Sequence, residues 1–236
     1  MTTPSLLEFA RGPLFVATLS FMALGLLRRF LSHLWQFRAS LKRLSHRDIA
    51  VGANVRESLL WLVPVRHLYR NRPLVSLTSF LFHLGIVIVP VFLVGHIDRW
   101  RSGIGVGWRG IAPHVADVLT LLTVAGALVL LGFRIFDAAG RALSRAGDYL
   151  LLVAVLLPFV SGFAAMHPAW NPTRYDTMML VHVLSAELLF VLLPTTKLSH
   201  AVLFMFARFS SAVFWKMPEG AGDRVALELY GEERRV

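Results

Sequence analysis

The chain has 236 residues, of which 56% are hydrophobic and only 16% are charged, with a formal net charge of +10. This charged fraction is low for a soluble domain, in which about a quarter of the residues carry charge. The sequence has no cysteine, which excludes disulfides, thiolate-held iron–sulfur clusters, covalent c-type haem and cysteine zinc sites within the chain. Any metal must therefore be held by histidine, carboxylate or methionine.

The apolar residues form long continuous runs. A helix needs about 20 apolar residues to cross a bilayer core of about 30 Å, and the runs are too long for barrel strands. The sequence therefore predicts an all-α integral membrane protein with about five transmembrane helices. In chain order the predicted spans are 12–31, 75–97, 112–135, 148–166 and 177–206. The first run lacks a basic leader and a cleavage motif, so we interpret it as a retained helix.

A polar stretch, residues 32–74, separates the first two spans and mixes charges with Leu, Trp and Tyr. This composition is typical of amphipathic helices that lie on the membrane surface or against a partner subunit. We expect a membrane domain over residues 1–206 and a cytoplasmic C-terminal tail over residues 207–236.

Most lysines and arginines lie between the first two spans, between the third and fourth, and in the C-terminal segment. The positive-inside rule then predicts a multi-pass protein of the cell inner (cytoplasmic) membrane, with its N-terminus outside and its C-terminus in the cytoplasm. These basic loops account for the net charge, so we expect no nucleic-acid partner.

Four of the nine histidines fall inside two predicted spans: His83 and His96 in the second, and His182 and His200 in the fifth. A histidine in hydrocarbon is costly unless it is paired, and so indicates a functional site. Because the two spans run in opposite directions, His83 would meet His200 near the inner face and His96 would meet His182 near the outer face. Two such pairs are what two bis-histidine haems require. The others are read as solvated or interfacial: His33, His46, His67, His114 and His167.

The spacing of the four histidines fits this pairing unequally. His182 and His200 are 18 residues apart, or about five helical turns, and would share one face of a continuous helix. His83 and His96 do not differ by whole turns, but Pro90 lies between them and would bend the helix or change its register. Two glycines near these histidines, Gly85 and Gly95, would admit a flat macrocycle or serve helix packing.

Two sequence motifs resemble those of a known family. They are Phe82-His83-Leu84-Gly85-Ile86 with Gly95-His96, and His182 followed by Pro194-Thr195-Thr196-Lys197-Leu198-Ser199-His200. With the expected topology and Asp148 opening the fourth span, they resemble the cytochrome b (gamma) subunit of respiratory nitrate reductase. Relatives of that subunit include membrane subunits of heterodisulfide-reductase-like and sulfite-reductase-associated complexes. The second-span histidines are farther apart than in the nitrate reductase pattern, so the inner pair fits the family better than the outer pair.

The resemblance implies a haem-binding helical bundle with two b-type haems that link quinone chemistry to a cytoplasmic partner. Quinol, either menaquinol or ubiquinol, would be oxidised near the outer haem. Electrons would cross to the inner haem and pass to an iron–sulfur subunit and a catalytic subunit. The reverse direction uses the same parts. Substrate chemistry is expected in the partners, and no catalytic residue is expected in this chain.

Five further polar residues are candidate site residues. Lys197 and Arg134 would bind haem propionates or extend to the interface. Near the outer face His114 and Asp117, with Glu187 in the fifth span, would handle quinol protons, or would be ordinary polar contacts. The rival hypotheses are a single-haem anchor, a non-haem proton-coupled transporter and a purely structural anchor.

Overall fold

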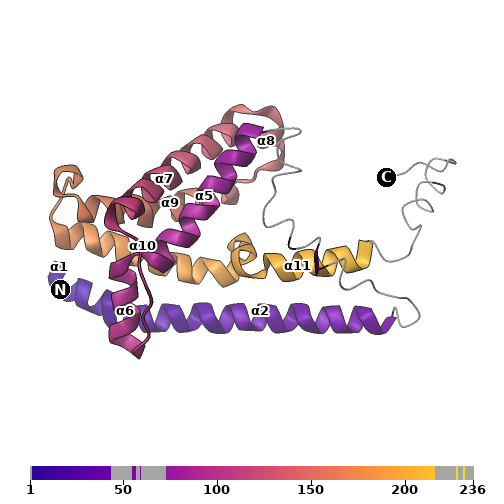
Figure 1. The fold of residues 1–236 in the computed structure, drawn as a ribbon, viewed down its shortest axis with the longest axis horizontal. Helices are drawn as coiled ribbons and strands as arrows, with labels where there is room; N and C mark the ends of the chain where they lie inside the picture. Colours follow the sequence, from indigo (N-terminus) through magenta and orange to yellow (C-terminus); the bar gives the residue numbers. More distant parts are fainter. Residues whose placement is uncertain are drawn as a thin grey trace. The chain divides into compact units, whose positions relative to one another are not determined.

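The computed structural model describes residues 2–43, 55–56, 59, 73–215, 227 and 231. Within these residues the chain is helical and contains no strand, which confirms the all-α prediction. The elements in chain order (Figure 1) are α1 (Thr3–Phe9), η1 (Ala10–Leu14), α2 (Phe15–Arg43), α5 (Pro73–Phe92), α6 (Val94–Ile104), α7 (Pro113–Phe136), α8 (Ala138–Leu143), α9 (Ala146–Met166), η2 (Pro168–Trp170), α10 (Tyr175–Thr195), η3 (Lys197–Ser199) and α11 (His200–Trp215).

Five helical segments of the described chain are long and apolar enough to cross a membrane. They are the continuous run Thr3–Ala39 and the helices α5, α7, α9 and α10. Large apolar side chains on these segments are exposed, including Leu24, Val87, Leu128 and Val160. Exposure on this scale would be unfavourable in water, whereas lipid solvates such side chains. The architecture is that of a multi-pass membrane protein, as predicted.

The helix bounds correct three predicted spans. The first helical run, Thr3–Ala39, extends beyond the predicted 12–31 at both ends. At its C-terminal end, Arg28 and Arg29 lie inside α2 and do not end the helix. The predicted span 75–97 is interrupted at Leu93, which has an extended backbone three residues after Pro90. The predicted span 177–206 is interrupted at Thr196, extended and two residues after Pro194. Proline lacks an N–H donor and crowds the preceding turn, so both helices end shortly after it.

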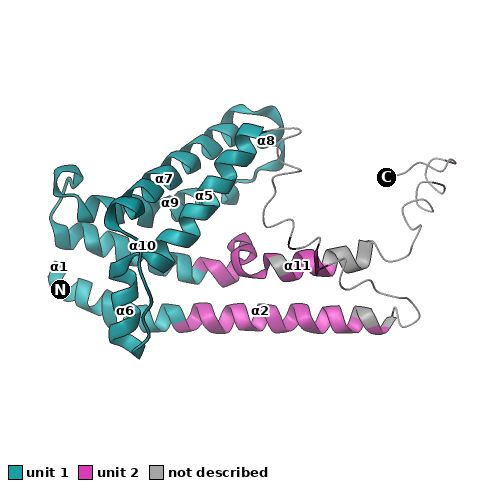
Figure 2. Cartoon of the chain, viewed as in Figure 1, with its two compact units in different colours: residues 1–19, 66–191 teal, residues 20–65, 192–236 magenta. Residues whose placement is uncertain are grey.

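The chain divides into two compact units (Figure 2): residues 1–19 with 66–191, called unit 1, and residues 20–65 with 192–236, called unit 2. In unit 1, α7 packs against both α5 and α9, and the three helices are labelled in Figure 1. Its core joins Phe82, Ala127 and Leu156, one from each of these helices.

Small residues allow α5 and α7 to approach closely. A Cβ at Gly85 would collide with the hydroxyl of Thr123, and a Cβ at Gly126 would lie 3.3 Å from Phe82 Cβ. Glycine permits this approach because it has no side chain. Of the two functions considered for Gly85, the structure supports helix packing.

Unit 2 joins α2 to the segment from residue 192 onward. Pro194 approaches α2 at Gly25, where a Cβ would lie 2.6 Å from the proline ring. Arg29 donates a hydrogen bond of 2.8 Å from Nη1 to Ser199 Oγ. Phe206 makes edge contacts with Phe30 and Phe37. A charged and an aromatic contact therefore hold the η3 turn and α11 against α2.

Two predicted regions extend beyond the described residues. The amphipathic stretch 32–74 starts inside α2, and between Arg43 and Pro73 only residues 55–56 and 59 are described. The tail 207–236 starts inside α11, and after Trp215 only residues 227 and 231 are described.

Candidate functional site

The end of α5 positions the first histidine of the site. The last four carbonyls of a helix have no partner within it. Here Val89 O accepts from Leu93 N (3.0 Å), Pro90 O bonds His96 Nδ1 (3.0 Å), Val91 O accepts from Trp108 Nε1 (2.9 Å), and Phe92 O accepts from Ile111 N (3.0 Å). All four are satisfied. The break at Leu93 is thus a built feature that orients His96.

The structure brings His96 of α6 and His182 of α10 together. Their ring centroids are 6.0 Å apart, and the ring planes are inclined by only 7°. His182 Nδ1 bonds the carbonyl of Pro158 on α9 at 2.8 Å, just as His96 Nδ1 bonds that of Pro90. A carbonyl only accepts, so each Nδ1 carries the proton and each neutral ring presents an Nε2 lone pair.

The ring separation equals that of two imidazoles on a single metal when their Nε2 atoms face each other. Two metal–nitrogen bonds of about 2.0 Å on opposite sides of one metal place the nitrogens about 4 Å apart. Adding a ring radius of about 1.1 Å at each end gives centroids about 6 Å apart for bis-imidazole ligation. A hydrogen bond from the other ring nitrogen to a backbone carbonyl is how proteins fix a metal-binding histidine.

Gly162 lets the His182 ring reach its carbonyl. A Cβ at this position on α9 would lie 2.8 Å from both His182 Cε1 and Nδ1. At Gly95, beside His96, a Cβ would meet nothing within 4 Å. Gly162 is therefore part of the site, and Gly95 leaves open space next to it.

Burial favours the neutral form of His96, and one cation, Arg11, lies near the pair. Burial lowers the pKa of His96, and the hydrogen bond to Pro90 partly opposes this shift. The neutral form required for metal binding is thus favoured. Arg11, on the π-helical turn η1, lies close enough to His182 for their charges to interact. π-Turns occur often at functional sites.

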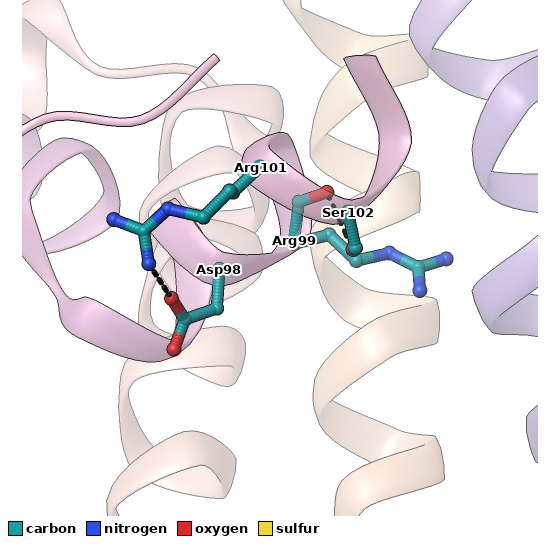
Figure 3. A network of polar contacts seen from close by, with 4 residues as sticks. All are labelled: Asp98, Arg99, Arg101 and Ser102. Carbon is teal, nitrogen blue, oxygen red and sulfur yellow. Dashed lines mark hydrogen bonds and ion pairs between the residues drawn. The ribbon is translucent and has the colours of Figure 1, made fainter. Parts of the chain in front are cut away.

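The polar groups of α6 beyond His96 are engaged locally (Figure 3). Arg101 Nη1 pairs with Asp98 Oδ1 at 2.8 Å, and Ser102 Oγ donates to the carbonyl of Arg99 at 3.1 Å. The guanidinium of Arg99 lies 5.3 Å from the ring centroid of Phe15, a cation–π contact. The Asp98–Arg101 pair thus lies within the short helix that carries His96, and Arg99 joins that helix to Phe15.

The second predicted pair is divided between the units, with His83 in unit 1 and His200 in unit 2. Each ring is oriented like the first pair: His83 Nδ1 bonds Ser79 O at 2.6 Å, and His200 Nδ1 bonds Lys197 O at 2.7 Å. The expectation that His182 and His200 share one face of a continuous helix is wrong, because α10 ends at Thr195 and His200 starts α11. The pairing of His83 with His200 stays a prediction.

The two predicted propionate-binding cations lie in the short η3 turn and in the last turn of α7. Lys197 is exposed in η3. Arg134, in the last turn of α7, donates from Nη1 to Ser144 Oγ at 3.2 Å, and its carbonyl accepts from Tyr149 Oη at 2.9 Å. Arg134 thus also ties the end of α7 to the start of α9.

The predicted proton-handling residues lie on α7 and α10. His114 is exposed in the first turn of α7. Asp117 Oδ2 lies 3.4 Å from Nε2 of His167, at the end of α9. Glu187 is 3% exposed, and neither carboxylate oxygen has a hydrogen-bond partner among the described residues.

Sequence reasoning missed three contributors: His167, Gly162 and the carbonyl of Pro158. Two of the prolines inside apolar helices, Pro90 and Pro158, carried a usable signal, because proline disturbs the helical hydrogen-bond pattern. Nothing in the sequence links His167 to Asp117, since they lie on different helices. Within the described residues, no group of three or more His, Asp or Glu side chains could hold a metal ion, whereas an axially ligated haem needs only two protein ligands.

No family model matches the sequence, and no solved structure matches the chain. A protein of Nitratidesulfovibrio vulgaris (strain Hildenborough), described only as "Protein", is 33% identical over 220 residues. The match covers 92% of this chain and 96% of the relative. The chain therefore belongs to the same family as this Nitratidesulfovibrio vulgaris protein.

Proposed function

We propose that the chain is a dihaem b-type cytochrome subunit of the inner (cytoplasmic) membrane. It carries electrons between the quinone pool, menaquinone or ubiquinone, and a cytoplasmic iron–sulfur subunit of a respiratory oxidoreductase complex. The observation that carries the proposal is the pair His96 and His182, with parallel rings 6.0 Å apart and both Nδ1 atoms on backbone carbonyls. That arrangement matches the needs of one metal ligated from both sides.

The surroundings of this pair also suit a flat macrocycle. Space is open at Gly95, and α10 packs less closely on the other described helices than α5 and α9 do on α7. When bound, haem b supplies a one-electron carrier. His96 and His182 would hold one haem and His83 and His200 the second. Propionates, which are anionic, would be bound by Lys197 or Arg134, and Arg11 adds a cation beside His182.

The proposed direction across the membrane follows the basic loops, with the N-terminus outside and the C-terminus in the cytoplasm. The His96–His182 pair then lies toward the outer face. Quinol oxidation belongs on that side, near His114 and Asp117. The iron–sulfur subunit and the catalytic subunit would dock on the basic stretch 32–74 and the tail 207–236.

One alternative function has a specific observation in its favour. A proton-coupled transporter is favoured by Glu187, whose buried carboxylate oxygens have no hydrogen-bond partner among the described residues. Proton flux into proteoliposomes that is lost in Glu187→Gln, with no haem in the folded protein, would support the transporter.

The proposal is tested by electron paramagnetic resonance of the oxidised protein in its membrane. Imidazole planes within 7° of parallel predict a rhombic low-spin ferric signal. This signal should vanish in His182→Ala and persist in His114→Ala, which removes an exposed imidazole. Folded protein with no low-spin haem signal would contradict the proposal.

A further inference from the structure

The contact between Asp117 and His167 joins two helices of unit 1. His167 follows α9, and Asp117 lies one turn into α7. The His167 ring is held by Phe163, which stacks on it with centroids 4.1 Å apart and bonds its Nδ1 through the backbone carbonyl at 2.9 Å. Nε2 is thereby directed to Asp117 Oδ2, 3.4 Å away.

The hydrogen bond of His167 to Phe163 determines which nitrogen of the neutral ring is unprotonated. A carbonyl accepts only, so Nδ1 carries a proton, and in a neutral imidazole Nε2 then carries a lone pair. That lone pair and the Asp117 carboxylate are two acceptors facing each other. One added proton on Nε2 converts this contact into an attractive ion pair. The pair is therefore built to take up one proton.

The pair lies near the His96–His182 site and near water. Gly162, where α9 meets the His182 ring, precedes His167 by five residues, or about 7.5 Å along the helix. The His167 and Asp117 side chains are 32% and 42% exposed. A proton taken up here can therefore pass on to solvent.

We propose that Asp117 and His167 are the proton acceptor for quinol at this end of unit 1. The inference rests on the proposed quinol-linked function. Oxidation of a quinol to a quinone breaks two O–H bonds and releases two protons and two electrons, and the haem that His96 and His182 would hold would supply the one-electron acceptor. Asp117 accepts the hydrogen bond of the quinol hydroxyl and is the catalytic residue. His167 stores the proton on Nε2, returns it to water and repeats this for the second proton, acting through Asp117 as a positioning residue.

Other charged or titratable side chains near this end are His114 on α7, Arg109 before it, and Arg174 and Asp176 at the start of α10. Across the described residues, no ion pair joins any of them to Asp117 or His167. The two residues thus form a self-contained pair.

The test uses the full complex in membranes with the variants Asp117→Asn, Asp117→Glu and His167→Gln. Arg174→Gln is the matched control, because it removes an exposed charged side chain at the same end of unit 1 that, among the described residues, makes no ion pair with Asp117 or His167. Each variant is measured for haem content, for the rate of haem reduction by a soluble quinol across pH, and for equilibrium binding of a hydroxynaphthoquinone. The binding measurement requires no turnover.

Asp117→Asn should slow reduction by quinol about 100- to 10,000-fold, the range of general acid–base contributions, with haem content unchanged. It should weaken hydroxynaphthoquinone binding about tenfold, and Asp117→Glu should recover part of both. His167→Gln should slow reduction and remove the acid limb of the pH profile with little effect on binding. A purely structural role would leave that profile unchanged.

The proposed role of Asp117 and His167 would be overturned if both Asp117→Asn and His167→Gln had wild-type rates, pH profiles and binding. The cytochrome proposal would still stand in that case. Wild-type membranes without quinol-reducible haem would overturn both. If Asp117→Asn fails to assemble, His167→Gln decides the question by itself.

Discussion

At the scale of single residues, the backbone carbonyls of two prolines orient the paired imidazoles. His96 uses Pro90 O, in the last turn of α5, and His182 uses Pro158 O, inside α9. Sidedness alone predicted that His96 would face His182. The carbonyl acceptors could not be predicted, because they depend on a helix break and on the approach of a third helix.

Gly162→Ala tests this orientation. The new Cβ would lie 2.8 Å from the His182 ring, so the ring must move off Pro158 O. Loss of such a supporting hydrogen bond typically lowers metal affinity about 10- to 100-fold. Haem transfer to an excess of apocytochrome should be faster in the variant by a similar factor.

Gly132→Ala is the control for that variant, since a Cβ there meets nothing within 4 Å. It should retain haem as the wild type does. Equal retention in both variants would show that Gly162 does not support a haem ligand.

At the scale of elements, proline explains why the sequence predicted the number of helices better than their ends. Hydropathy fixes the apolar runs, and all five were found. Pro90 was expected to bend its helix or change its register, and the chain does break at Leu93. Pro194 was placed inside a continuous span, and the break at Thr196 removes the shared face assumed for His182 and His200. Hydropathy cannot detect such breaks, because apolar residues continue on both sides.

Close packing of α5 on α7 gives a prediction about stability. Gly85→Ala would bring a Cβ into the hydroxyl of Thr123, a fully buried side chain, and should lower the free energy of unfolding by about 1–3 kcal/mol. Thr123→Ala combined with it should recover part of the loss, because the colliding hydroxyl is gone. Thermal unfolding in detergent measures both. Additive losses in the double variant would contradict this contact.

At the scale of the whole molecule, the sequence predicted a five-span helical protein, and the described chain has that form. The long apolar segments of the sequence allowed this prediction, because a helix in the membrane interior is the stable state for such segments. The division into two units was not predicted, since it depends on which parts of α2 and α10 pack with which neighbours. The membrane orientation, the partners and the second histidine pair stay predictions.

Removal of residues 216–236 tests the proposed docking surface. Because α11 ends at Trp215, the cut leaves every described helix of unit 2 intact. The truncated chain should keep its full haem content and recover less iron–sulfur subunit on purification. Unchanged recovery of the partner would refute a docking role for the tail.

The central claim is that this chain holds haem between paired histidines. The most direct measurement is haem content per chain by pyridine haemochrome on purified folded protein, with a redox titration of the b-type absorption. We predict about two haems per chain that titrate at separate potentials, with His96→Ala and His182→Ala losing the same one. Correctly folded protein without haem would contradict the claim.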